Sequence, residues 1–276
     1  MRSDRARSCL RAQYYLRALR VWLTVYRRIW RSSVFSSVLG PLFYLTAMGF
    51  GLGSLVDRNL VAGHPGGGID GVSYLAFVAP AILAVQAMQS AMAESTFPVY
   101  GGVKWDHRYV AALATPLRPA DIFGGHMLFI TLRLTMNSVI FLVIAAAFGS
   151  IGSPWALAAL PAAVLTGCAF AAPVAAWAIT LRKETAFYYA FRFGMTPLML
   201  FSETFFPLSR LPGWLQPVAW VTPLWHGVAL CRALTIGTAA AGLTAGSVAI
   251  HVAYLLALAG LGLWAGARAY TRRLYV

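Results

Sequence analysis

The residues that could do chemistry are few in this 276-residue chain, and they do not combine into a recognisable catalytic or metal site. The chain has 8 acidic residues and 5 histidines, and it contains neither an HExxH nor a GxSxG motif. Its two lysines, Lys104 and Lys183, do not fit a GxxxxGK[ST] phosphate loop. Cys9, Cys168 and Cys231 lie too far apart to suggest a metal site. We therefore expect no catalytic residue, no metal ligand and no cofactor bound by this chain.

The stretch KWDHRYVAALATP, residues 104–116, is the most informative polar segment. Its spacing predicts a short helix over 104–114 that ends before Pro116. An apolar stripe would lie beside charged side chains, and such a stripe needs cover from lipid, from neighbouring helix ends, or from a groove on a cytoplasmic partner. The candidate contact residues are Lys104, Trp105, Asp106, Arg108, Tyr109 and Leu113.

Arg133 is a charge within an otherwise apolar run, roughly 16 Å into the third predicted span. An arginine at this depth is costly and faces protein or water. It either contacts an anionic substrate or binds a neighbouring helix. None of the acids is predicted at mid-membrane, since Glu203 is placed near the outer surface, and this disfavours proton-driven transport. The energy for any transport is therefore expected to come from a partner.

The composition identifies an integral membrane protein. Apolar residues make up 59% of the chain and charged residues 11%, with a mean hydropathy of +0.69. These values exclude a typical soluble enzyme and a disordered chain. The net charge is +14, but 9 of the 22 basic residues fall in the first 31 positions. Such a block before a span is typical of contact with anionic lipid, so we expect no nucleic-acid partner.

The apolar runs predict an all-α fold with six transmembrane helices, because each run is long enough to cross a bilayer. Gly and Pro at residues 149–154 divide the longest run in two. The predicted spans are Ser32–Val56, Gly71–Met92, Ile122–Phe148, Trp155–Thr180, Ala186–Ser202 and Val248–Ala267.

Residues 1–31 are predicted to form an amphipathic helix at the cytoplasmic interface, although a basic flank without a fixed helix is the alternative. Tyr15, Leu19, Trp22, Tyr26 and Ile29 share one helical face, opposite the arginines. No cleaved signal peptide is expected. With six spans, basic residues gather on one side, which predicts a multi-pass protein of the inner (plasma) membrane with both termini in the cytoplasm.

Residues 203–232 between the fifth and sixth spans are rich in proline and tryptophan. Proline removes backbone hydrogen bonds that lipid cannot replace, and tryptophan favours the headgroup level. We predict broken, re-entrant helices in the outer leaflet; a kinked seventh span is the alternative. His226 would cap one of these helices or touch substrate.

Two sequence motifs in this chain resemble those of a known family of membrane proteins. The run KWDHRYVAALATPLRPADIFGG, residues 104–125, resembles the cytoplasmic loop of type-2 ABC exporter permeases, especially those for nodulation lipo-oligosaccharides and for daunorubicin resistance. Residues 201–232 resemble that family's outer re-entrant segment, although Ser202-Glu203 stands where the family often has Ser-Gly. The outer residues that carry the resemblance are Phe206, Pro207, Leu211, Pro212, Pro223 and His226.

The resemblance implies that residues 1–276 form one type-2 ABC transporter transmembrane domain. It implies two permease copies, identical or related, and two ATPase subunits that bind ATP and Mg. Residues 104–114 would be the coupling helix that touches the ATPase. The cargo would be an amphiphile such as a lipo-oligosaccharide, a polysaccharide precursor or a hydrophobic drug.

The substrate path is expected at the seam between the two permease copies, with walls from the first, second and fifth spans. Two other classes of function stay open from the residues alone: a stand-alone carrier or channel, and an intramembrane lipid-modifying enzyme. The candidate path residues are Phe43, Tyr44, Met48, Phe77, Arg133, Met195, Met199 and Phe201.

Overall fold

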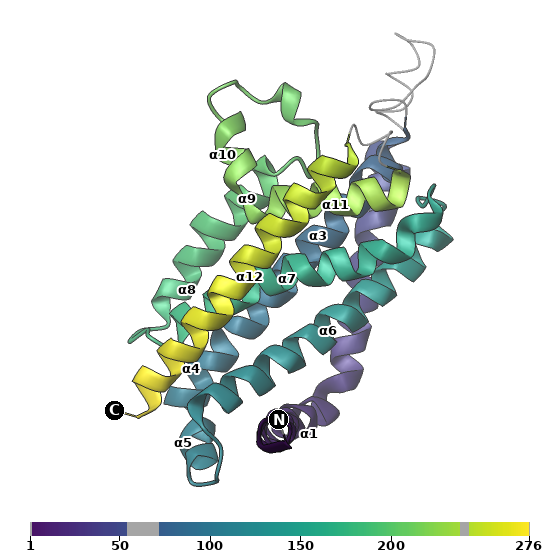
Figure 1. The fold of residues 1–276 in the computed structure, drawn as a ribbon. Helices are drawn as coiled ribbons and strands as arrows, with labels where there is room; N and C mark the ends of the chain where they lie inside the picture. The colour runs from purple at the N-terminus through teal and green to yellow at the C-terminus, as the bar shows by residue number, and fades with distance from the viewer. Residues whose placement is uncertain (1, 54–71, 238–242, 276) are drawn as a thin grey trace, which may run out of the picture.

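The protein is a bundle of long helices, seen in a computed structural model that describes residues 2–53, 72–237 and 243–275. Every regular element in these ranges is helical (Figure 1). The long helices are α1 (Arg2–Thr46), α3 (Tyr74–Ser95), α6 (Pro119–Ala147), α7 (Ala159–Ala178) and α12 (Ala245–Leu274). The loop that carries Asp57 and Asp70, with the adjoining ends of the first two predicted spans, lies outside the described residues.

Shorter helices connect the long ones. Two of them, η1 and η3, are π-helical, and two, η2 and η4, are 3₁₀ turns. The short elements are η1 (Ala47–Gly53), α4 (Phe97–Lys104), α5 (Arg108–Leu113), η2 (Pro154–Ala158), α8 (Thr185–Tyr189), η3 (Ala190–Met195), α9 (Thr196–Phe201), η4 (Leu208–Arg210), α10 (Gln216–Val221) and α11 (Pro223–Ile236).

Five helical segments in the described ranges are long and apolar enough to cross a membrane. This confirms an all-α membrane fold. The five segments are Gln13–Gly53, Tyr74–Lys104, Pro119–Ala147, Pro154–Ala178 and Ala245–Leu274.

The predicted fifth span, Ala186–Ser202, is not among these five segments. Here α8, η3 and α9 follow one another without a break from Thr185 to Phe201. This run is about 25 Å long at the rise of an α-helix, which is less than the roughly 30 Å thickness of a bilayer core. A π-helical turn in its middle shortens and widens it further.

The predicted interfacial helix and the first span are one element, α1, and not two. Figure 1 shows that α1 changes direction: its N-terminal part is seen end-on, and the rest runs along the bundle. Tyr15, Leu19, Trp22 and Tyr26 face inward as predicted. The arginines on the opposite face are exposed: Arg17, Arg20, Arg27, Arg28 and Arg31. Ile29 is 51% exposed, so its predicted inward position is wrong.

The two ends of the bundle differ in what they carry. The N-terminus, α5 and the C-terminus lie at one end, and α10 lies at the other (Figure 1). Residues 203–232 fold into η4, α10 and most of α11. Neither α10 nor α11 is long enough to cross a bilayer, and α11 packs against α3, α7 and α12.

Small residues bring α7 and α12 close together. α7 contains nine alanines among its 20 residues and contacts α3, α6, α11 and α12. Small side chains allow the close backbone approach on which helix association in membranes depends. At the tightest point, a Cβ atom placed on Gly262 of α12 would lie 2.5 Å from Pro173 Cδ and 2.7 Å from Pro173 N.

Gly262→Ala should therefore force α7 and α12 apart. Overpacking of this kind costs about 1–3 kcal/mol, and we expect a lower thermal unfolding temperature in detergent. Gly260→Ala on the same helix is the matched control, because no heavy atom lies within 4 Å of a Cβ atom placed there. Equal unfolding temperatures for the two variants would contradict the close contact.

Candidate functional site

The polar stretch between α3 and α6 folds as two short helices joined by a tight turn. α4 ends at Lys104, which is exposed, and α5 begins at Arg108. His107 has a φ of 51°, in the left-handed region, which reverses the chain between the two helices. Asp106 and Arg108 form an ion pair of 2.7 Å across this turn. The predicted helix over 104–114 is therefore wrong at its start, and the loop helix is α5.

Trp105 and Tyr109, the two aromatic residues of this loop, have opposite environments. Trp105 is 55% exposed at the turn, and its ring rests edge-on to Tyr100 with 5.6 Å between ring centroids. Tyr109 is 2% exposed and packs on Tyr270 of α12 at 5.8 Å. This burial raises the pKa of Tyr109 to about 12. The prediction that Tyr109 presents its ring to a partner is corrected: it anchors the loop to α12, and Leu113 is half-buried.

Arg108 connects the loop to two long helices through stacked rings. Its guanidinium lies 4.7 Å from the ring centroid of Trp22 on α1. Trp22 in turn stacks on His126 of α6, with 3.9 Å between centroids and an angle of 6° between the planes. A cation above an aromatic face is attracted by the ring quadrupole. The loop, α1 and α6 are thereby joined at one point.

A cavity of about 330 Å³ opens beside this stack, between α1, the α3–α4 segment, the loop and α6. Its wall contains two arginines and two acids, so the lining is balanced in formal charge. The lining residues are Trp22, Val25, Tyr26, Ile29, Glu94, Phe97, Pro98, Gly101, Trp105, Asp106, Arg108, Phe129 and Arg133.

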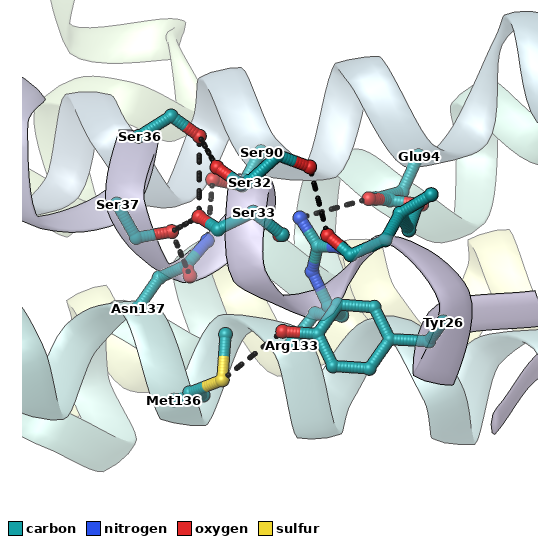
Figure 2. Close-up of polar contacts among 11 residues, drawn as sticks. Tyr26, Ser32, Ser33, Ser36, Ser37, Ser90, Glu94, Arg133, Met136 and Asn137 are labelled. Carbon is teal, nitrogen blue, oxygen red and sulfur yellow. Dashed lines mark hydrogen bonds and ion pairs between the residues drawn. The ribbon is translucent and has the colours of Figure 1, made fainter.

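Arg133 pairs with Glu94 in the wall of this cavity. The two side chains, from α6 and α3, are 3.2 Å apart and are 15% and 18% exposed. The guanidinium of Arg133 also lies 4.9 Å from the ring centroid of Tyr26 on α1, and Figure 2 shows the three side chains together. Of the two alternatives for Arg133, the structure favours the contact between neighbouring helices.

Polar contacts continue from this ion pair along the same three helices (Figure 2). Ser37 of α1 donates a hydrogen bond to Asn137 Oδ1 at 2.9 Å, and Asn137 Nδ2 donates to Ser90 Oγ of α3 at 3.1 Å. Asn137 lies one helical turn beyond Arg133 on α6. Together with the Arg133–Glu94 pair, Ser37, Ser90 and Asn137 form a line of polar contacts inside the bundle, referred to below as the polar seam.

A second ion pair lies near the other end, where α9 meets α11. Arg232 is 3.1 Å from Glu203, and its guanidinium is 3.9 Å from the ring centroid of Phe77. Trp225 Nε1 donates a hydrogen bond to Glu203 Oε2 at 2.9 Å. Glu203 has a φ of 61°, a conformation that L-residues adopt rarely. The glutamate at this position therefore has a contact with α11 that a glycine could not make.

His226 does not cap a helix. Thr222 caps α11 by accepting a hydrogen bond from Trp225 N at 3.3 Å. His226 is buried, and its Nδ1 lies 2.7 Å from Nδ1 of His251 on α12. It also stacks on Tyr254 at 4.0 Å. The interpretation of His226 as a cap is thus wrong, and the residue joins α11 to α12.

The remaining predicted path residues are not gathered on one surface. Phe43 is 65% exposed, whereas Phe77 is 2% exposed beneath Arg232 and cannot line a surface of this chain. Gln89 of α3 lies 3.7 Å from Met199 Sδ, which places α9 beside α3. The half-buried members are Tyr44, Met48, Met195, Met199 and Phe201.

The other residues of the predicted outer re-entrant segment, apart from His226, differ in how deeply they are buried. Leu211 is 8% exposed and Pro212 is exposed. Gln216 donates a hydrogen bond to the carbonyl of Leu211 at 3.1 Å, which closes the turn before α10. Phe206, Pro207 and Pro223 are half-buried.

Sequence reasoning missed Glu94 as the partner of Arg133. The second span was expected to end at Met92, which left Glu94 outside the membrane, but α3 continues to Ser95. The signal was available, since an arginine within a span needs a nearby acid and Pro98 is the first helix breaker after Glu94. The stack of Arg108, Trp22 and His126 left no comparable signal.

Comparison with known proteins decides the family. The family model described as ABC-2 type transporter matches residues 12–236, which is most of the chain. The chain belongs to the ABC-2 type transporter family. This confirms the resemblance to type-2 ABC permeases. The protein is therefore a multi-pass membrane permease, and family membership implies an ABC ATPase partner.

Relatives of this ABC-2 permease are nodulation proteins J from rhizobia. The protein of Sinorhizobium fredii is 30% identical over 262 residues, which cover 92% of this chain and 94% of the relative. The protein of Rhizobium leguminosarum bv. trifolii is 32% identical over 225 residues, or 78% and 81%. The protein of Bradyrhizobium diazoefficiens is 29% identical over 262 residues, again 92% and 94%.

The Arg133–Glu94 pair should be a structural requirement of this permease. Glu94→Gln leaves a mostly buried arginine without its partner, and such a change costs about 3–5 kcal/mol. Arg133→Gln should also destabilise, and the double variant should recover part of the loss. The measurement is a double-mutant cycle on thermal unfolding in detergent.

Asp106→Asn and Arg108→Gln are the matched cycle on an exposed pair, for which we expect a coupling of no more than about 1 kcal/mol. Additive losses at positions 94 and 133 would show that the two side chains do not interact. In that case Arg133 would be free to contact an anionic substrate.

Proposed function

We propose that this permease is the membrane subunit of an ATP-driven exporter that moves an amphiphile out of the cytoplasm or the inner leaflet. Two separate ATPase subunits would bind ATP and Mg and supply the energy. The observation that carries the proposal is the family match together with an exposed loop that is fixed to three long helices. A stand-alone carrier does not explain why such a loop is built.

The loop could transmit a movement of the ATPase to the long helices of the permease. Trp105 stands exposed at the turn beside the Asp106–Arg108 pair, where a groove on an ATPase could hold its ring. A displacement of the turn would act on α1 and α6 through the stacked rings of Arg108, Trp22 and His126. It would act on α12 through Tyr109 and Tyr270. Lys104 precedes the turn and Leu113 ends α5, and both would add contact area.

The proposed topology has six spans, with α8, η3 and α9 together as the fifth. A short span is tolerated where the bilayer thins or a neighbouring helix covers it. The N-terminus, α5 and the C-terminus lie at one end, which we assign to the cytoplasm of a cell with this protein in its inner membrane. The elements η4, α10 and α11 would then be re-entrant from the outer leaflet.

A second copy of this permease, or a related one, would complete the path. Two helical faces carry exposed aromatic rings that an isolated chain leaves uncovered: Phe43 on α1 is 65% exposed and Phe193 on η3 is 69% exposed. An interface between the two copies that is lined by such rings would suit the hydrocarbon chain of a lipid-linked saccharide, or a hydrophobic drug. Phe77 is withdrawn from the path because it is covered within the chain.

Replacement of Trp105 by alanine should uncouple the exporter. Loss of a large aromatic anchor from an interface weakens binding by about 2 kcal/mol or more. We therefore expect the ATPase subunit to bind the permease roughly thirtyfold or more weakly. The assay is co-purification and cargo-stimulated ATP hydrolysis in reconstituted vesicles.

Trp214→Ala is the matched control, since Trp214 is 74% exposed but precedes α10 at the other end of the bundle. This variant should retain full coupling. Normal ATPase binding by the Trp105 variant would contradict the assignment of the loop. Uphill accumulation of cargo in vesicles that contain this chain alone would contradict the exporter proposal itself.

A further inference from the structure

A hollow of about 400 Å³ lies against the last turns of α12, away from the loop, the polar seam and the outer ion pair. Two of its features are unusual together: three of its lining side chains are arginines, and none is an acid. The lining residues are Thr180, Trp264, Ala265, Arg268, Ala269, Arg272 and Arg273.

The sequence of α12 separates an outer face from an inner one. Trp264, Arg268 and Arg272 recur every four residues, so they follow one another along one side of the helix. Gly266 and Tyr270 lie on the other side of the helix and are buried, and a Cβ atom placed on Gly266 would overlap the ring of Phe123 on α6. The arginine side is thus turned away from the bundle.

The arginines of this hollow are available to a ligand. All three are exposed, and within the described residues none forms an ion pair with a carboxylate. The guanidinium of Arg268 lies 4.9 Å from the ring centroid of Trp264, which holds it over the aromatic face. Concentrated positive charge with fork-shaped donors matches a phosphate group, which arginine binds through two parallel hydrogen bonds.

The apolar surface beside the arginines indicates a lipid and not a free anion. Further along α12, towards the middle of the helix, Leu261 is 64% exposed and Trp264 is 60% exposed. Tryptophan favours the headgroup level of a bilayer, with its apolar ring toward the acyl chains. A ligand that fills the hollow and follows this face therefore has a negative head and a hydrocarbon tail.

We propose that this hollow is a binding site for an anionic phospholipid. Its phosphodiester would lie among Arg268, Arg272 and Arg273, and an acyl chain would run past Trp264 and Leu261. The site requires no partner protein and does not depend on the exporter proposal. In the proposed orientation it faces the cytoplasmic leaflet, where anionic lipids gather basic residues near membrane ends.

The test compares lipid binding to the purified full chain by native mass spectrometry and by thermal unfolding in detergent. Phosphatidylglycerol should bind in preference to phosphatidylcholine with the same acyl chains, and it should raise the unfolding temperature. The variant with Arg268→Gln, Arg272→Gln and Arg273→Gln should lose this preference by about tenfold or more, since it lacks all three basic side chains that would face the phosphodiester.

Two further variants keep the test decisive. Replacement of the same three arginines by lysine preserves the charge but removes the fork, and it should retain an intermediate preference. Replacement of Arg118, Arg192 and Arg210 by glutamine removes the same charge from exposed positions outside the hollow and should leave the preference unchanged.

Three outcomes would overturn the proposal. Equal binding of the two lipids by the unmodified chain would show that the hollow does not select an anionic head. An unchanged preference in the glutamine variant would place the lipid elsewhere. Stabilisation by inorganic phosphate equal to that by phosphatidylglycerol would show a free-anion site without a role for the acyl chain.

Discussion

A mostly buried arginine needs an opposite charge within reach, and two such pairs fix contacts between distant parts of this chain. Arg133 is paired with Glu94, and Arg232 with Glu203. Glu94 and Arg133 come from two different helices, and Glu203 lies in the bend after α9 while Arg232 belongs to α11, so each pair fixes a contact between segments that are distant in sequence. Hydrocarbon supplies no solvent to replace a lost partner. The first pair joins α3 to α6, and the second joins the end of α9 to α11.

Aromatic rings accompany each ion pair and extend its reach. Tyr26 places α1 against Arg133, and Phe77 places α3 against Arg232. Contacts of this kind are favourable where water is excluded, because the ring face replaces part of the lost hydration of the cation. Helices with few charged residues are thus held in specific positions. The same physics, at the loop, attaches Arg108 to Trp22.

The sequence predicted the class of the fold and much of the helix order, because long apolar runs and their breaks are local features. It also placed the loop and the outer segment in the family pattern. It failed where the answer depended on a distant contact. The partner of Arg133, the burial of Tyr109 beneath Tyr270 and the pairing of His226 with His251 each require two segments to meet. An apolar stripe on a predicted helix, such as the one with Trp105 and Tyr109, does not by itself indicate which ring faces a partner and which packs within the protein.

The glycines and alanines along α7 and α12 have a mechanical consequence. Gly262 leaves no room for a side chain against Pro173, so α7 and α12 approach each other closely at this point. Gly125 of α6 admits Ala18 of α1 in the same way. Close contacts of this kind, made through small residues, leave the two helices little freedom to move. In contrast, α8, η3 and α9 contact their neighbours through long, flexible side chains such as Met199. The closely packed helices would then serve as a rigid frame. The conformational change of each transport cycle would be concentrated in α8, η3 and α9, which are held by flexible side chains.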